Sequence, residues 1–171
     1  MSRNVPSFAE LLASTESSAI HLEMRDTYEP DDPKFLAWRM TGTLAGFGEG
    51  SRWYDLISSA VARGVTVRRA RIVSEPVTDY IRFEHAVTSL HNIPAGELVR
   101  WLPRRRASDL ALPGNDFWVF DDRLVRFHHF SGDGHSLDEE FSEDANVIKL
   151  CVTAFEAVWE RAIDHANYQP T

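Results

Sequence analysis

The segment Ser74–Arg82 places two carboxylates, a phenol and a guanidinium close together, in Glu75, Asp79, Tyr80 and Arg82. It follows a stretch that predicts a strand and begins one that predicts a helix. Open α/β sheets bind ligands at the carboxyl ends of their strands. We therefore predict a pocket here for a ligand or partner. A hydrolase or nucleotide-processing enzyme built on Glu75, Asp79 and Arg82 is the catalytic alternative.

Glu23 and Arg25 end a segment whose apolar residues alternate, which predicts a strand. If that strand is adjacent, both side chains extend the predicted pocket. The same residues also have a structural interpretation, in which Ser74 or Thr78 caps the helix and nearby acids complement its dipole.

The only dense basic cluster contains Arg100, Trp101 and the run Arg104–Arg106, and four further arginines could extend it: Arg63, Arg68, Arg69 and Arg71. Guanidinium groups suit phosphates or the carboxylates of a protein partner. The formal net charge of −8 opposes attraction to DNA, so a protein partner is favoured over nucleic acid. Direct DNA binding and a solvated loop remain the alternatives.

No metal or cofactor is expected. Neighbours on a strand point to opposite faces, so His128 and His129 could not share one ion, and His129, Asp133 and His135 match no familiar ligand spacing. Cys151 lies on an apolar helical stripe and is expected in the core. The sequence contains no nucleophile elbow, glycine-rich phosphate loop or dinucleotide fingerprint.

The predicted elements alternate helix and strand before closing with a hairpin. The first is a helix within 1–18, with a capping box at Ser7 and Glu10, and a strand follows from Ala19. Next come a helix after Asp32-Pro33, a glycine-rich mobile loop over 42–50 and a helix from Ser51 to Gly64. A strand over 65–73, a helix over 77–90, a strand over 98–102, a hairpin over 116–120 and 124–130, and a long helix over 144–166 complete the chain. The acidic run from Asp138 to Asp144 is expected to be a helix-dipole complement and a solvated face, or else a contact for a basic regulator.

A chain of 171 residues with 43% hydrophobic residues fits one domain, 1–171, with a buried core. No apolar run approaches the roughly 20 residues that span a bilayer, and the N-terminus lacks a signal-peptide pattern. One cysteine fits a reducing compartment. We expect a cytoplasmic protein with no membrane contact.

The junction Arg63-Gly64-Val65-Thr66-Val67 and the later strand Asp116–Phe120 resemble one half of a phospholipase D-like domain. In that superfamily a histidine nucleophile, a phosphate-holding lysine and an aspartate share one H-x-K-x-x-x-x-D segment. The corresponding positions are Gly114, Asp116 and Asp121, so only the aspartate is matched. The resemblance implies the fold without its phosphodiester chemistry. It also implies homodimerisation, because one half normally needs a second to complete a site.

A closer resemblance covers most of Ile20 to Phe130, in the runs Leu22–Tyr28, Arg71–Arg82, Ala95–Glu97 through Trp101–Pro103, and Asp116–Asp121. These runs resemble an actinobacterial domain-of-unknown-function family encoded beside Xre-type helix-turn-helix regulators. The association implies a regulatory role but no mechanism.

Together these observations predict an α/β fold, with α+β character at its C-terminal end, in which helices flank a mixed sheet. The expected function is non-catalytic regulation through a helix-turn-helix partner. The residues expected to bind a ligand or partner are Glu23, Arg25, Glu75, Asp79, Tyr80, Arg82, Arg100, Trp101, Asp116 and Asp121.

Overall fold

The computed structural model describes residues 5–171, which contain one seven-stranded mixed sheet of order β6-β5-β4-β1-β2-β3-β7. The strands are β1 (Ser18–Glu23), β2 (Thr66–Val73), β3 (Leu98–Pro103), β4 (Asp116–Phe120), β5 (Leu124–Phe130), β6 (Ser136–Ser142) and β7 (Ile163–Asp164). The helices are α1 (Phe8–Ser14), α2 (Pro33–Thr41), α3 (Arg52–Ala62), α4 (Asp79–Leu90) and α5 (Ala145–Arg161), with a short 3-10 turn at Arg104–Arg106.

Strand β1 lies at the centre of the sheet. It pairs in parallel with β2 and antiparallel with β4, while β2 pairs in parallel with β3. The hairpin of β4 and β5, extended by β6, completes one side. Because β1, β2 and β3 run in the same direction, the segments that follow them meet at one edge of the sheet.

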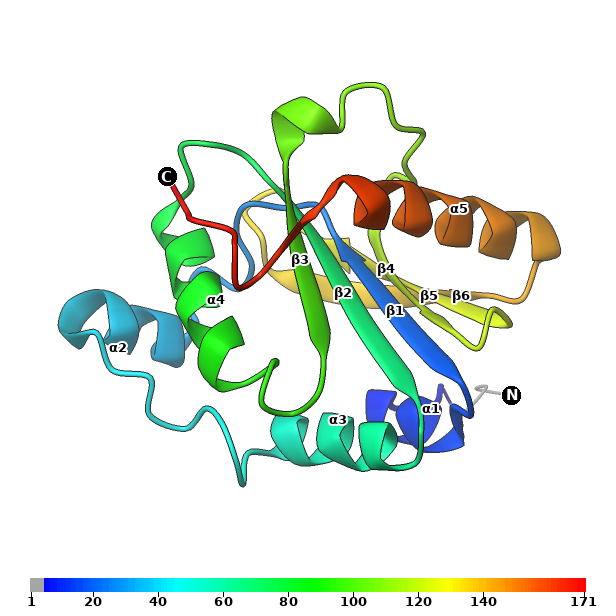
Figure 1. The fold of residues 1–171 in the computed structure, drawn as a ribbon, viewed down its shortest axis with the longest axis horizontal. Coiled ribbons are helices and arrows are strands. Elements are labelled where there is room, and N and C mark those ends of the chain that lie inside the picture. The colour runs from blue at the N-terminus through cyan, green and yellow to red at the C-terminus, as the bar shows by residue number, and fades with distance from the viewer. Residues whose placement is uncertain (1–4) are drawn as a thin grey trace.

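One face of the sheet is apolar and is covered by α5. The alternation of side chains along each strand places Ile20, Leu22, Ala70 and Ile72 on this face. They pack against the apolar stripe of α5, which contributes Cys151, Phe155 and Val158. Cys151 is fully buried, so the prediction that it is a core residue is confirmed. In Figure 1, α5 (orange) lies on one side of the strands, and α3 and α4 lie on the other.

Two groups of helices cover the opposite face. Helices α1 and α3 pack over one end of β1, β2 and β4, through a cluster that includes Leu12, Ile57 and Trp118. Helices α2 and α4 pack over β2 and β3, through a cluster that includes Phe35, Phe83 and Trp101. The helix groups leave the polar centre of this face between them.

Helix starts follow the predicted caps. The Ser7 hydroxyl accepts from Glu10 N, Asp32 caps α2, Ser51 caps α3 and Thr78 caps α4. These side chains satisfy amides that have no partner within the helix. The first helix predicted within 1–18 is limited to Phe8–Ser14, and residues 1–4 lie outside the described residues.

Three sequence predictions require correction. The last helix does not continue to residue 166: it ends at Arg161, because Ala162 is extended and Ile163–Asp164 pairs with β3. Strand β6 was not predicted, because its exposed acidic sequence has no apolar alternation. The alternation over the first strand is typical of a strand with one buried face, but both of its faces are covered, and His21 is only 8% exposed.

Candidate functional site

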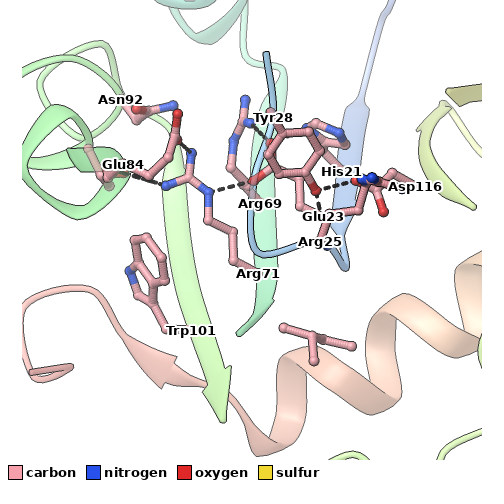
Figure 2. Close-up of polar contacts among 12 residues, drawn as sticks. His21, Glu23, Arg25, Tyr28, Arg69, Arg71, Glu84, Asn92, Trp101 and Asp116 are labelled. Carbon is pink, nitrogen blue, oxygen red and sulfur yellow. Dashed lines mark hydrogen bonds and ion pairs between the residues drawn. The ribbon is translucent and has the colours of Figure 1, made fainter. Parts of the chain in front are cut away.

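A buried ion network lies at the centre of the polar face, where β1 and β2 run side by side (Figure 2). Glu23 on β1 contacts two arginines of β2 at once. Its Oε1 accepts from Arg69 Nη1 at 2.6 Å and its Oε2 accepts from Arg71 Nε at 2.5 Å. The alternation of β2 explains this arrangement, because Arg69 and Arg71 share one face while Ala70 and Ile72 face α5.

Both arginines have further carboxylate partners. Arg69 Nε donates to Glu97 at 2.5 Å, and Arg71 Nη2 lies 2.6 Å from Glu84. Asn92 donates to the second oxygen of Glu97 at 2.7 Å. The network thus joins two guanidiniums to three carboxylates, and each guanidinium contacts two of them.

The electrostatics keep these groups ionised despite their burial. Burial alone would raise the pKa of Glu23, but Arg71 and Arg69 outweigh it and lower that pKa well below its usual range. For Arg69, burial is outweighed by Glu97 and Glu23, which raise its pKa. Pairing with groups of opposite charge therefore keeps the buried carboxylates and guanidiniums ionised.

A cavity of about 670 Å³ lies over this network, between α1 and α3 on one side and α4 on the other. Its floor is formed by side chains of the sheet, namely His21, Arg69, Arg71, Trp118, Arg126 and His128. Its walls come from the helices and the loop before α3, and include Phe8, Phe47, Trp53, Glu84 and His91. A cavity of this size is typical of small-molecule sites.

Two histidines in the floor are uncharged at neutral pH. Burial, followed by the nearby Arg69, lowers the pKa of His21 well below its usual value. Burial and Arg126 lower the pKa of His128 to about 4. Each neutral imidazole has one donor and one acceptor nitrogen.

The strand that corresponds to the phospholipase D motif is used structurally. Asp116, at the lysine position, is buried and accepts from the Tyr28 hydroxyl and from Met24 N, the latter at 2.9 Å. Burial raises the pKa of Asp116 to about 7. Gly114, at the histidine position, is exposed and has no side chain. These positions therefore offer neither a nucleophile nor a phosphate-binding cation.

Asp121, the one matched position, fastens the β4–β5 turn to the start of β1. Its Oδ1 accepts from Ser17 N at 2.7 Å and Ser18 N at 2.9 Å, and its Oδ2 accepts from Glu16 N at 2.9 Å. These hydrogen bonds outweigh partial burial and hold the pKa of Asp121 below its usual range. Its carboxylate is thus fully engaged within the fold.

The residues predicted from Ser74–Arg82 do not converge on one pocket. Glu75 accepts from the Tyr168 hydroxyl at 3.0 Å, whereas the Tyr80 hydroxyl donates to Glu84 at 2.8 Å. Asp79 and Arg82 are exposed on α4. None of these four predicted residues lines the 670 Å³ cavity. Thr78 caps α4, as the structural interpretation of this segment expects.

Of the two residues predicted after the first strand, Glu23 is central and Arg25 is separate. The Arg25 guanidinium donates to Ser131 O at 3.2 Å and lies 5.2 Å from the centre of the Phe130 ring. The segment that contains Ser74 follows β2, which pairs with β1, and Ser74 N donates to Asp26 at 2.7 Å.

The arginines do not form one basic patch, which corrects the sequence expectation. Arg68 and Arg100 lie on the α5 face and pair with Glu156 and Asp164. Arg69 and Arg71 are buried on the opposite face, and Arg71 lies over the fully buried Trp101. Alternation along β2 separates residues that are neighbours in the sequence.

Most of the cavity lining was not predicted from the sequence. Its floor residues His21, Arg69, Trp118, Arg126 and His128 come from four strands, and only the pairing of those strands brings them together. The alternation of side chains with a period of two could have indicated the cavity floor, because it places polar residues on one face of β1, β2 and β5. Among residues 5–171, no group of His, Cys, Asp and Glu side chains could hold a metal ion.

Comparison with solved structures places the fold in a known class. The chain superposes on Nuc from Salmonella typhimurium, a phospholipase D family member, with a TM-score of 0.52 at 11% identity, covering 91% of this chain and 86% of that one. It is also similar to TrmBL2, described as an archaeal chromatin protein with a novel mode of DNA binding, with a TM-score of 0.50 at 16% identity. That match covers 90% of this chain but only 47% of TrmBL2.

The protein therefore has an α/β, phospholipase D-like fold, as the sequence resemblance predicted. Residues 6–170 match the family model described as domain of unknown function DUF6879, and the chain belongs to that family. A search of curated proteins found no match. Within the described residues, no helix is both long and apolar enough to cross a bilayer.

Proposed function

We propose that the chain is a cytoplasmic, non-catalytic regulatory protein that acts by binding a partner, expected to be a helix-turn-helix transcription regulator. The observation that carries the proposal is the use of Asp116 at the position where phospholipase D-like catalysts need a lysine. Its carboxyl group is committed to Tyr28 and Met24. A carboxyl group there supplies no positive charge to hold a phosphodiester, and Gly114 could not attack one.

The acidic edge of the sheet supports a basic partner. Strand β6 is an edge strand, and its Asp138 and Glu140 side chains are 76% and 62% exposed. Leu137 is also exposed beside them. An edge strand presents unpaired backbone groups, and acidic side chains along it attract a cationic surface. The net charge of −8 favours the same class of partner.

The resemblance implies that a helix-turn-helix regulator is encoded beside the gene, and that regulator is the partner to test. Co-expression, size exclusion and calorimetry should give a stable complex whose affinity falls as salt rises. Replacing Asp138 and Glu140 with lysine should weaken binding by about tenfold or more, because two attractive contacts become repulsive.

The matched control replaces Glu49 and Glu160 with lysine, since both are exposed and lie outside β6. This control has the same net charge as the variant at Asp138 and Glu140, and it should bind the partner nearly as well as the native chain does. The proposal fails if no complex forms, and the assignment to β6 fails if both variants lose affinity equally. Neither the hydrolase alternative at Glu75, Asp79 and Arg82 nor direct DNA binding has comparable support in the geometry.

A further inference from the structure

The cavity of about 670 Å³ over the ion network is lined by more positive than negative charge. Among the described residues, its lining contains one carboxylate, that of Glu84, and four guanidinium groups, those of Arg52, Arg69, Arg71 and Arg126. The other carboxylates that pair with these arginines do not line the cavity, and they are Glu23, Glu97 and Glu139. The four guanidiniums and four carboxylates balance overall, but the surface that the cavity presents is mainly cationic.

Arg52 is the most accessible of these arginines. It is the first residue of α3, it lines the cavity, and its side chain is exposed, so it lies at the rim. Within residues 5–171, the Arg52 guanidinium makes no hydrogen bond and no ion pair. The acid one turn further along the helix, Asp55, does not line the cavity. A guanidinium in this position can bind a carboxylate or a phosphate through paired hydrogen bonds.

Arg126, in the cavity floor, is the least neutralised of the three buried arginines. Within the described residues it has one carboxylate partner, Glu139, which is 31% exposed, whereas Arg69 and Arg71 have two partners each. Burial lowers the pKa of Arg126, while the carboxylates around Arg69 and Arg71 outweigh burial and raise theirs. A negative charge in the cavity is therefore stabilised by the field of Arg126 without touching it.

The walls between the rim and the floor are largely apolar. Ala9 of α1, Phe47 of the loop before α3 and Leu56 of α3 each line the cavity and are only partly buried. A ligand that covers these side chains removes apolar surface from water. A small inorganic anion would leave them hydrated, and a cationic ligand would be repelled by Arg52. The lining therefore fits a molecule with one anionic end and an apolar body.

We propose that this cavity binds a small organic anion, whose oxyanion head, a carboxylate or a phosphate, is held by Arg52 at the rim. Its apolar body lies inside, against Ala9, Phe47 and Leu56. The inference goes beyond the proposed function and does not depend on it, because Asp138 and Glu140 of β6 do not line the cavity. A bound ligand of this kind gives a regulatory protein an input.

The test is calorimetry of the full chain with probes that share an apolar body and differ in the head group, used below their micelle concentrations. Octanoate and octyl phosphate carry the two oxyanion heads, octanamide and octylamine carry neutral and cationic heads, and acetate and inorganic phosphate lack the body. 4-Phenylbutyrate and its amide repeat the comparison with an aromatic body.

We expect at least one anionic probe with a body to bind with micromolar affinity, about tenfold more tightly than its neutral or cationic counterpart and than the small anions. The tighter of octanoate and octyl phosphate identifies the head group. Rising salt should weaken the binding of the anionic probe more than that of the amide, because only the anionic probe is attracted by charge.

Two variants locate the head and the body. Arg52→Gln should weaken binding of the anionic probe about fivefold and leave that of the amide unchanged, because it removes only the charge at the rim. Leu56→Ala should weaken both probes about threefold, because it removes apolar wall. The control Lys149→Gln changes the net charge as Arg52→Gln does, but alters an exposed residue of α5 on the opposite face, and should leave both affinities unchanged. Thermal unfolding should show that all three variants are folded.

Four results would overturn the proposal. The first is the absence of binding by every anionic probe. The second is an amide or amine that binds as tightly as its anionic counterpart, and the third is acetate or inorganic phosphate that binds as tightly as the probes with a body. The fourth is a preference for the anion over the amide that is unchanged in folded Arg52→Gln. None of these results bears on whether the partner complex forms.

Discussion

At the scale of single residues, Glu23 is the carboxylate that both arginines of β2 contact. Its side chain is only 13% exposed, so little solvent screens its removal. Glu23→Gln keeps the shape but leaves two buried guanidiniums with less negative charge around them. We expect it to lower the free energy of unfolding by about 3 kcal/mol, as measured by urea denaturation at pH 7.

The matched control for Glu23 is Glu156→Gln. Glu156 also pairs with an arginine of β2, Arg68, but its side chain is 49% exposed. Exposed pairs contribute less than about 1 kcal/mol. Equal losses in the two variants would show that burial does not set the strength of the network.

The raised pKa of Asp116 predicts how the free energy of unfolding changes with pH. The change has the opposite sign to that caused by an ordinary ion-paired carboxylate. Its pKa of about 7 in the folded chain lies above the value of about 3.9 expected when unfolded. The folded state therefore keeps a proton that the unfolded state loses, and this group's contribution to stability falls as pH rises from 4 to 7.

Asp116→Asn removes that titration while keeping most of the shape. Relative to the native chain, the variant should gain stability between pH 4 and pH 7, by at most about 4 kcal/mol. Urea denaturation of both proteins across this range measures the difference. A difference that is constant with pH would mean that Asp116 titrates normally in the folded state.

The sequence identified individual residues better than it identified their partners. Glu23 and Asp116 were singled out as candidates for binding a ligand or partner. The sequence could not show that Glu23 meets Arg69 and Arg71, because that contact depends on β1 pairing in parallel with β2. Arg126 and His128 carried no sequence signal of their own. They matter because β5 places them on the same face as His21.

At the scale of elements, Asp121 joins the β4–β5 turn to the residues that lead into β1. Asp121→Ala leaves three backbone amides without their acceptor. We expect a loss of about 2 kcal/mol in the free energy of unfolding at pH 7, because hydrogen bonds to a charged group are being removed.

The pH dependence of the Asp121 effect provides a check. Since its folded pKa is depressed, the stabilisation is present above the unfolded value of about 3.9 and is lost as pH falls below it. Denaturation at pH 7 and pH 3 should therefore show a large difference between native and variant only at the higher pH. A folded variant with native stability at pH 7 would contradict this structural role.

Elements with strong local signals were predicted closely. The hairpin of β4 and β5 has the expected bounds, and the caps of α2, α3 and α4 lie at Asp32, Ser51 and Thr78. The failures occurred where tertiary pairing decides. Strand β6 has a polar sequence that becomes a strand only beside β5, and the residues after Arg161 leave the helix to pair with β3.

At the scale of the whole molecule, the absent catalytic residues give a direct prediction. The purified chain should hydrolyse a chromogenic phosphodiester such as bis(p-nitrophenyl) phosphate no faster than a buffer blank. Homodimerisation, which the resemblance to one phospholipase D-like half implies, would not change this outcome. A second copy would contribute only another Gly114 and another Asp116.

A steady-state assay at several protein concentrations makes this measurement, with an authentic phospholipase D-like nuclease as the positive control. Turnover that rises with protein concentration and disappears in Asp121→Ala, under conditions where that variant is folded, would contradict the non-catalytic proposal. Turnover unaffected by that substitution would indicate a different site.

The central position of β1 also bears on how the chain acquires its structure. In the sequence, β1 comes long before β2 and β4, the two strands with which it pairs: Ser18 pairs with Thr66, and Leu22 pairs with Phe117. A ribosome would therefore release β1 long before β4 could join it and before α5 could cover its apolar face. We expect the nascent chain to remain incomplete and prone to association until that helix emerges, so the protein should fold slowly and late in translation.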